Sequence, residues 1–318
     1  GTGGDNSAVA SQLSSGVRQI FSAGTAFAAL KSDGSVVSWG NGDGGGNSSA
    51  VASQLSSGVN QIFSSYGAFA ALTVDGSVVS WGNAGGGGDS SAVASQLSSG
   101  VRQLFSTANA FAALKTDGSV ISWGSDVGTI SSAVASQLST GVRQLFSTTN
   151  AFAALKADGS VVTWGKAYGG GDSSAVASLL LSGVRQIFAS ANAFAALKGD
   201  GSVVTWGDGG SGGDSSAVAN LLLSGVSQIF STGTAFAALK TDGSVVTWGY
   251  WGYGGNSIAV ASQLSSGVSQ IFSTYDAFAA LKTDGSVVTW GDGRWGGNSS
   301  AVASQLGSGV SQIFSTGS

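Results

Sequence analysis

The segment spanning residues 26–40 recurs seven times along the chain with few changes. Each copy ends in Trp-Gly, and the seven tryptophans are Trp39, Trp81, Trp123, Trp164, Trp206, Trp248 and Trp290, at spacings of 42, 42, 41, 42, 42 and 42 residues. A period near 40 residues with strand-like patterning is typical of propellers and repeat arrays. One copy is too small to bury a core alone, so neighbouring copies must pack against one another.

The repeats account for almost the whole chain. They cover 7–48, 49–90, 91–131, 132–173, 174–215, 216–257 and 258–299, and a half repeat covers 300–318. We therefore expect one propeller domain over 1–318, although the length alone would suggest about two domains. The half repeat and the opening at Gly1 rather than Met indicate a processed or excised piece of a longer array. A designed consensus sequence is the alternative, and the unequal linkers favour natural drift.

Each repeat predicts one short helical turn followed by three strands. In the first copy, Val9 and Leu13 are four residues apart and Gly16 can end a helical turn. Residues 17–22, 26–31 and 35–39 are short, rich in β-branched or aromatic residues, and bounded by turn residues. Asp-Gly between the last two segments is a strong hairpin signal. We predict an all-β, seven-bladed β-propeller with three-stranded antiparallel blades and a short helical turn between blades.

The composition excludes several kinds of chemistry. The chain has no His, Cys, Met or Pro, and all of its 16 acidic residues are Asp. The usual zinc, iron and copper ligand sets and the His-based nucleophile pairs are therefore missing, and we predict no catalytic residue, metal or cofactor. Charged residues make up 9% of the chain and the net charge is −4, which does not suit a nucleic-acid surface. No apolar run is long enough for a membrane span.

Two motifs run in sequence through each copy: Gly-Val-x-Gln-Ile-Phe-Ser, first at residues 16–22, and Ala-Phe-Ala-Ala-Leu-Lys-x-Asp-Gly-Ser-Val-Val-x-Trp-Gly, first at 26–40. This repeat resembles that of the regulator of chromosome condensation family, chiefly through Leu-x-x-Asp-Gly-x-Val-x-x-Trp-Gly. Three-stranded blades make the chain look most like the bacterial members, such as the propeller-type β-lactamase inhibitor protein. The resemblance implies a seven-bladed propeller that binds other macromolecules. Eukaryotic members often have His where Ala26 stands, so no chromatin or nucleotide-exchange residue is carried over.

Variation among the copies is confined to two places. One is the three residues between the first two strands, and the other is the linker after Trp-Gly. If the first strand runs up, its loop lies at the top, the Asp-Gly turn lies at the bottom, and the linker leaves from the top. We therefore expect both variable loops on one face and the nearly invariant turns on the other.

All five Tyr residues and the two Trp residues outside the repeat framework lie in these variable loops. They are Tyr66, Tyr168, Tyr250, Trp251, Tyr253, Tyr275 and Trp295. Because Tyr and Trp are enriched at binding hot spots, these residues are the candidate partner-binding site, for a protein or a glycan. The alternative is unconstrained drift, since single exposed aromatics are common.

A structural subunit of an extracellular or surface assembly is the second functional hypothesis, with the half repeat pairing with a neighbouring molecule. Extracellular or surface localisation is slightly favoured. Lys occupies the position of Lys31 in six of seven copies, which predicts a solvated ring of Lys–Asp pairs near the turns. Arg18 and its equivalents are expected to be solvated. The Gly-Gly-Gly-Asp linkers resemble calcium or phosphate loops, but they lack the tandem spacing or the Gly-Lys-Ser/Thr that those sites need.

Overall fold

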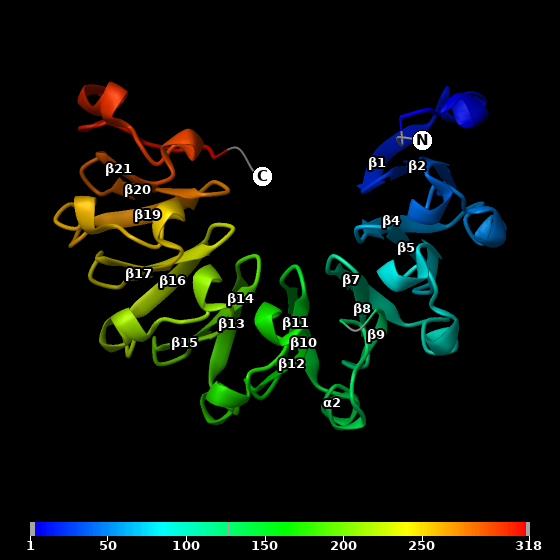
Figure 1. Ribbon diagram of the computed structural model, residues 1–318, viewed down its shortest axis with the longest axis horizontal. Helices are drawn as coiled ribbons and strands as arrows, with labels where there is room; N and C mark the ends of the chain where they lie inside the picture. The colour runs from blue at the N-terminus through cyan, green and yellow to red at the C-terminus, as the bar shows by residue number, and fades with distance from the viewer. Residues whose placement is uncertain (1–3, 126, 316–318) are drawn as a thin grey trace. The chain divides into compact units, whose positions relative to one another are not determined.

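The computed structural model describes residues 4–125 and 127–315, and each full repeat forms one three-stranded antiparallel sheet (Figure 1). We number these sheets blades 1 to 7 in chain order. Their strands are β1 (Val17–Ala23), β2 (Ala26–Lys31) and β3 (Val36–Gly40); β4 (Val59–Ser64), β5 (Ala68–Thr73) and β6 (Val78–Gly82); β7 (Val101–Ser106), β8 (Ala110–Lys115) and β9 (Val120–Gly124); β10 (Val142–Ser147), β11 (Ala151–Lys156) and β12 (Val161–Gly165); β13 (Val184–Ala189), β14 (Ala193–Lys198) and β15 (Val203–Gly207); β16 (Val226–Ser231), β17 (Ala235–Lys240) and β18 (Val245–Gly249); β19 (Val268–Ser273), β20 (Ala277–Lys282) and β21 (Val287–Gly291). The seven sheets match the blades of a seven-bladed β-propeller, so the predicted fold class is confirmed.

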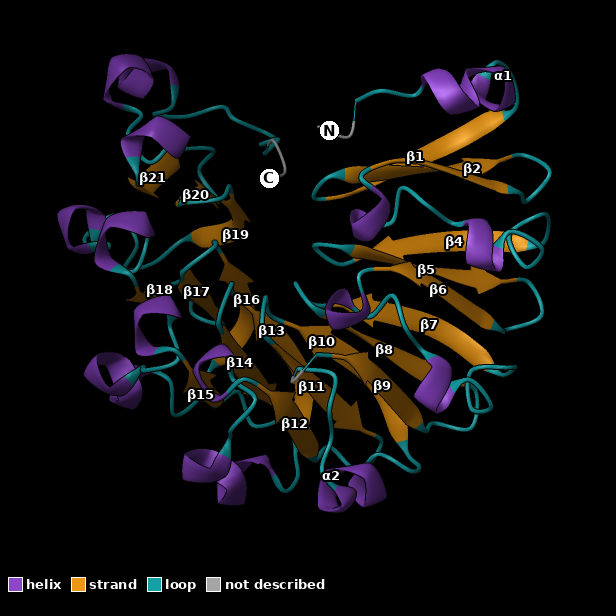
Figure 2. Cartoon of the chain, turned by 45° about the vertical axis from the view of Figure 1, so that its right-hand side comes forward, coloured by secondary structure: helices purple, strands orange, loops and turns teal. Residues whose placement is uncertain are grey.

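Short helical segments connect the blades, as the sequence predicts, and most of them are 3-10 turns (Figure 2). The two α-helical segments are α1 (Ala10–Leu13) and α2 (Ser132–Gln137). The 3-10 turns are η1 (Ser7–Val9), η2 (Gly42–Gly44), η3 (Ser49–Val51), η4 (Ala84–Gly86), η5 (Ser91–Val93), η6 (Ala167–Gly169), η7 (Ser174–Leu180), η8 (Gly209–Ser211), η9 (Ser216–Leu221), η10 (Trp251–Tyr253), η11 (Ile258–Val260), η12 (Gly293–Trp295) and η13 (Ser300–Gln305). Each is too short to be stable alone and depends on packing against the strands.

The chain falls into two compact units. The first is Gly1–Ala157 with Val162–Lys166, and it holds blades 1 to 3 and nearly all of blade 4. The second is Asp158–Val161 with Ala167–Ser318, and it holds blades 5 to 7 and the half repeat. A single domain over 1–318 stays a prediction.

The core lies between successive blades within each unit. Between blades 6 and 7, Ala237 and Leu239 pack against Ile271, Phe278 and Trp290. The small side chains of β17 let the bulky ones of the next blade approach closely, as the Phe-Ala-Ala-Leu pattern predicts. Phe278 and Trp290 stack with ring centroids 5.3 Å apart, and the same pair recurs in every blade.

Main-chain hydrogen bonds also join successive blades at the turn side. Val268 N, at the start of β19, donates to the Gly243 carbonyl in the Asp-Gly turn of blade 6, at 3.0 Å. Gly243 has φ +78°, and a Cβ there would stand 2.8 Å from Gly267 N. The turn glycine is therefore required both by its own conformation and by the next blade.

The half repeat docks on blade 7 in the same way. Val310 N donates to the Gly285 carbonyl at 3.0 Å, and Val287 N donates to the Leu306 carbonyl at 2.9 Å. Residues 310–315 nevertheless form no strand in the described chain, and Phe314 is 83% exposed.

Candidate functional site

The two variable loops of a blade lie against each other. We call the residues between the first and second strands the AB loop, and the 3-10 turn after the third strand the linker turn. In blade 6, the Thr232 hydroxyl donates to the Tyr253 carbonyl at 3.1 Å. In blade 7, the Thr274 hydroxyl donates to the Trp295 carbonyl at 2.8 Å. The shared face predicted from strand topology is confirmed in these blades.

Successive AB loops are linked through their main chains. In the second unit, Ala191 N donates to the Gly233 carbonyl at 2.8 Å, and Gly233 N donates to the Tyr275 carbonyl at 2.7 Å. In the first unit, Tyr66 N donates to the Ala108 carbonyl at 2.8 Å. Because these bonds use only backbone atoms, the bonds themselves do not require a particular side chain at the middle of each AB loop.

Four of the predicted aromatic residues form two ring pairs in the second unit. Tyr250 and Tyr253, both on the blade 6 linker, have ring centroids 4.8 Å apart. Tyr275 of the blade 7 AB loop and Trp295 of the blade 7 linker turn have centroids 5.4 Å apart. Trp251 lies beside the first pair on η10 and is 73% exposed. These five residues, with Asp292 and Arg294, are the aromatic cluster.

The other two predicted residues lie on the loops of other blades. Tyr66 belongs to the AB loop of blade 2 in the first unit and is 75% exposed. Tyr168 is on η6, after β12, and is 58% exposed. Neither residue is in a ring pair with the aromatic cluster.

Arg294, directly before Trp295 on η12, is held by an ion pair with Asp292, and sequence reasoning missed this contact. Its Nη2 donates to Asp292 Oδ2 at 2.6 Å, and its Nε donates to Asp292 Oδ1 at 3.1 Å. The hydrogen bonds and charge of this carboxylate, and more weakly an electrostatic interaction with Tyr253, raise the pKa of Arg294, so the guanidinium stays charged. Arg294 is thus within electrostatic range of Tyr253 on the blade 6 linker. Its position directly before Trp295 was the available signal.

A buried carboxyl group lies behind this cluster. Asp276, in the blade 7 AB loop, is 6% exposed, and its Oδ1 has no hydrogen-bond partner within the described residues. Burial, and next the charge of Asp292, raise the pKa of Asp276. The face therefore carries a destabilised carboxylate, the kind of feature found more often at functional sites than in structural cores.

The tyrosines of two AB loops also pack on a glycine in the AB loop of the preceding blade. A Cβ on Gly233 would stand 3.4 Å from Tyr275 Cζ, so the ring lies over this glycine. Tyr66 is placed similarly over Gly24, with Cδ1 3.7 Å from where a Cβ would stand. The AB loops of blades 3, 4 and 5 have Ala108, Thr149 and Ala191 at this position instead. A tyrosine in one loop is thus accompanied by glycine in the loop before it.

The glycines of the linkers have a structural role. Gly212 has φ +94°, and a Cβ there would stand 2.5 Å from the Phe236 ring. Its carbonyl accepts a hydrogen bond from Trp248 Nε1 at 3.0 Å. Each such glycine therefore covers the Phe–Trp pair of the following blade, which accounts for the Gly-rich linkers without a ligand. Among the residues the structure describes, no three His, Cys, Asp or Glu side chains are grouped so as to hold a metal ion.

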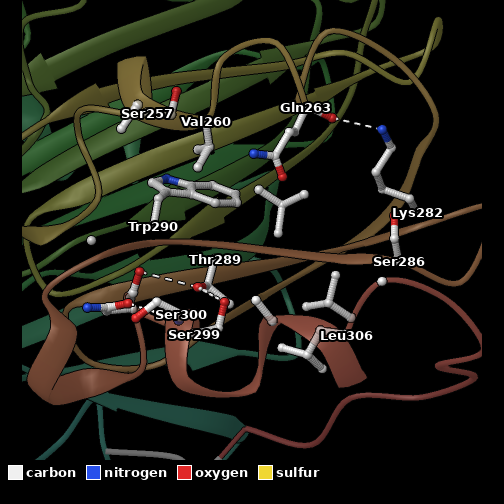
Figure 3. Close-up of a pocket in the computed structure, with 18 of the residues that line it drawn as sticks. Ser257, Val260, Gln263, Lys282, Ser286, Thr289, Trp290, Ser299, Ser300 and Leu306 are labelled. Carbon is white, nitrogen blue, oxygen red and sulfur yellow. Dashed lines mark hydrogen bonds between the residues drawn. The ribbon is translucent and has the colours of Figure 1, made fainter.

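The lysines near the turns bind a different partner from the one expected. Lys282 Nζ donates to the Gln263 carbonyl at 3.0 Å, across a groove between two helical turns (Figure 3). The expectation that each lysine pairs mainly with the Asp of its turn was wrong. The charge of Lys282 is only a minor cause of the lowered pKa of Asp284. The Arg18 side chain also differs from expectation, because its Nη2 donates to the Asn60 carbonyl of the next blade at 2.9 Å.

Comparisons with known proteins add little beyond the fold. No protein-family model matches the chain, and no curated protein matches it. Similar solved structures include the ectodomain of the receptor kinase CR4 of Physcomitrella patens, at 15% identity, 86% coverage of this chain, 72% of that chain and TM-score 0.42. The CRINKLY WD40 ectodomain of the Arabidopsis thaliana receptor kinase ACR4 has 17% identity, 86% and 96% coverage and TM-score 0.40. Yeast RCC1 (Prp20), in its crystal structure with Kap60, has 17% identity, 74% and 70% coverage and TM-score 0.41.

These scores are too low to transfer a partner or a residue. The family resemblance therefore depends on the repeat motif, which occurs in seven copies, and on the seven three-stranded sheets.

Every helical segment in the described part of the chain is too short or too polar to cross a membrane.

Proposed function

We propose that this chain is a non-catalytic binding propeller that engages a protein partner through the variable loops of blades 6 and 7. The observation that carries the proposal is the aromatic cluster, in which two ring pairs lie on the variable loops of consecutive blades and the charge of Arg294 interacts with Tyr253. Tyr, Trp and Arg are the residue types that dominate binding hot spots. The sequence supplies no His, Cys or Glu for acid–base or nucleophilic catalysis on this face.

The loops that carry the cluster are held in place before any partner arrives. Thr232 and Thr274 fix the two linker turns, and main-chain bonds connect the AB loops. A preorganised surface loses less conformational entropy on binding, so more of the contact energy appears as affinity. Trp251 at 73% exposure and Tyr275 at 48% leave large apolar areas for a partner to cover.

The test is a comparison of partner capture by two variants. One replaces Trp251, Tyr253, Tyr275 and Trp295 by Ala, and the control replaces the isolated Tyr66 and Tyr168 by Ala. We expect the first to weaken binding at least about tenfold per hot-spot residue lost, and the control to bind as the unchanged chain does. Protein and glycan arrays probed in parallel identify the partner class. Equal capture by both variants, or binding to glycans alone, would exclude a protein partner at this cluster.

The second candidate function is a structural subunit of an assembly, and one observation favours it. Residues 310–315 have the same sequence, Val-Ser-Gln-Ile-Phe-Ser, as β16 and β19, which each pair with a neighbouring strand. Phe314 is nevertheless 83% exposed. Such an edge can pair with a strand of another molecule. Light scattering at increasing concentration, with Phe314→Asp as the control, distinguishes discrete particles of about 31 kDa from larger assemblies.

A further inference from the structure

The lysine at the end of the second strand makes the same main-chain contact in five of the six blades that have it. In five blades its Nζ donates to a main-chain carbonyl 19 residues earlier, at the end of the helical turn, at 2.8–3.1 Å. These five pairs are Lys115–Gln96, Lys156–Gln137, Lys198–Leu179, Lys240–Leu221 and Lys282–Gln263. Figure 3 shows the last of them.

The aliphatic stem of this lysine crosses a glycine on the way. The Lys Cε lies 3.3–3.5 Å from where a Cβ of that glycine would stand in six blades. The glycines are Gly16, Gly100, Gly141, Gly183, Gly225 and Gly267. The groove beside each helical turn is thus partly filled by the chain's own alkylammonium group.

Blade 2 has the short side chain of Thr73 at this position. Its Oγ1 donates to Asp75 Oδ1 at 2.5 Å and lies 2.8 Å from the Ser77 carbonyl, so it stays within its own turn. Nothing lies within 4 Å of where a Cβ of Gly58 would stand. The path that the lysine stem takes in the other blades is open here.

The acceptor at the end of this path is also open. Gln54 is 19 residues before Thr73, and its carbonyl receives no hydrogen bond from the described residues. The groove that holds Gln54, Gly58 and Thr73 has a volume of about 1110 Å³. The corresponding grooves that contain Lys31 and Lys282 have volumes of about 450 and 630 Å³.

A negative charge without a lysine on its own turn lines this groove. Asp75 lines it, and hydrogen bonds from Thr73 and then Ser77 lower the pKa of its carboxyl group, so it is ionised at neutral pH. In the other blades the equivalent residue, for example Asp117, also feels the positive charge of its own lysine. No such lysine contributes at Asp75.

We propose that the blade 2 groove is a binding site for a primary alkylammonium group, supplied by a lysine side chain of a partner protein or by a free amine. The alkyl stem lies over Gly58, the ammonium donates to the Gln54 carbonyl, and the Asp75 carboxylate adds a weak favourable charge, as Asp284 does for Lys282. An ammonium with N–H donors suits this carbonyl acceptor, whereas a trimethylated one has no donor. The site lies in the first unit, shares no residue with the aromatic cluster, and does not depend on the function proposed for that cluster.

The experiment titrates two probes into the chain by NMR: n-butylammonium, and a short peptide with a single lysine. Exposed charge-assisted contacts of this kind are weak, so we expect a dissociation constant of about 1 mM. Thr73→Lys supplies the missing side chain, and we expect it to abolish binding. Binding of the peptide alone identifies a lysine of a polypeptide as the ligand, and equal binding of both probes identifies the free alkylammonium group as sufficient.

The matched control is Lys115→Thr, which copies the blade 2 arrangement into blade 3. We expect it to add a second site of similar affinity, beside Gly100 and the Gln96 carbonyl. A trimethyllysine peptide is expected to bind at least tenfold more weakly than the lysine peptide. Unchanged binding in Thr73→Lys, or no added site in Lys115→Thr, would overturn the proposal. Both substitutions exchange residues that the repeat already accepts at this position, so folding is retained.

Discussion

The turn side and the loop side of a blade are both joined to the next blade by main-chain hydrogen bonds, but only the turn side requires a particular residue there. On the turn side, the contact needs the positive φ of Gly243, and the Asp242 side chain closes the turn by accepting from Ser244. On the loop side, Gly233 N donates to the Tyr275 carbonyl at 2.7 Å, and neither residue has a positive φ. The turn residue is therefore fixed by its backbone conformation, whereas the loop-side bond itself requires no particular side chain. This difference explains the pattern of variation without any reference to function.

The largest expected effect comes from disrupting the contact between the Gly243 turn and the next blade. Gly243→Ala places a residue at φ +78° and a Cβ 2.8 Å from Gly267 N. Backbone strain and the loss of the Val268 hydrogen bond should together destabilise the chain by about 2–4 kcal/mol. The measurement is chemical denaturation followed by circular dichroism.

Gly209→Ala is the control for this prediction. Gly209 lies on the loop side in η8 at an ordinary φ, with no atom nearer than 3.5 Å to a Cβ there. We expect a change below about 0.5 kcal/mol. Equal destabilisation by the two substitutions would contradict the assigned difference between the sides.

The carboxylates of the two sides should respond to pH with opposite signs. Hydrogen bonds from Ser244 lower the pKa of Asp242 below its ordinary value of 3.8. Its stabilisation is therefore complete above pH 3.8 and is lost as the pH falls through the lower folded-state pKa. Burial raises the pKa of Asp276 above 3.8, so its unfavourable charge acts above the folded-state pKa and disappears as the pH falls toward 3.8.

Two amide variants separate these contributions. At pH 7, Asp242→Asn should lower the melting temperature, and Asp276→Asn should raise it. Both differences should shrink on acidification, that of Asp276→Asn at higher pH and that of Asp242→Asn only below pH 3.8. Thermal unfolding from pH 7 to pH 2.5 measures both, and two shifts of the same sign at pH 7 would contradict the assignment.

Most of the fold could be predicted because its signals are local and repeated. Asp-Gly turns, β-branched strands and the Trp-Gly ending occur seven times, so each copy supports the interpretation of the others. The shared loop face followed from strand direction alone. The aromatic residues were predicted to share one face, but not which rings would pair, because the ring distances depend on how the AB loop and the linker of a blade approach each other.

The contacts that were missed are those that reach between segments. The charge of Arg294 interacts with Tyr253 of the preceding blade, which no spacing within one repeat reveals. The ammonium of Lys282 reaches a carbonyl rather than the nearby Asp284, because the helical turn packs beside the strand. The open groove beside Gly58 follows from the same packing, although Thr73 was already visible as the exception among the lysines.

The smallest expected effect tests whether the residues of neighbouring AB loops depend on each other. Gly233→Ala puts a Cβ 3.3 Å from the Tyr275 carbonyl oxygen and 3.4 Å from Tyr275 Cζ, so the ring must move by a few tenths of an ångström. We expect a cost of about 1 kcal/mol and a changed near-UV circular dichroism signal from the Tyr275–Trp295 pair. Gly209→Ala should leave that signal as it is. If Gly233→Ala also leaves it unchanged at full stability, successive AB loops vary independently, and unconstrained drift then explains their aromatic residues better than a preorganised binding surface does.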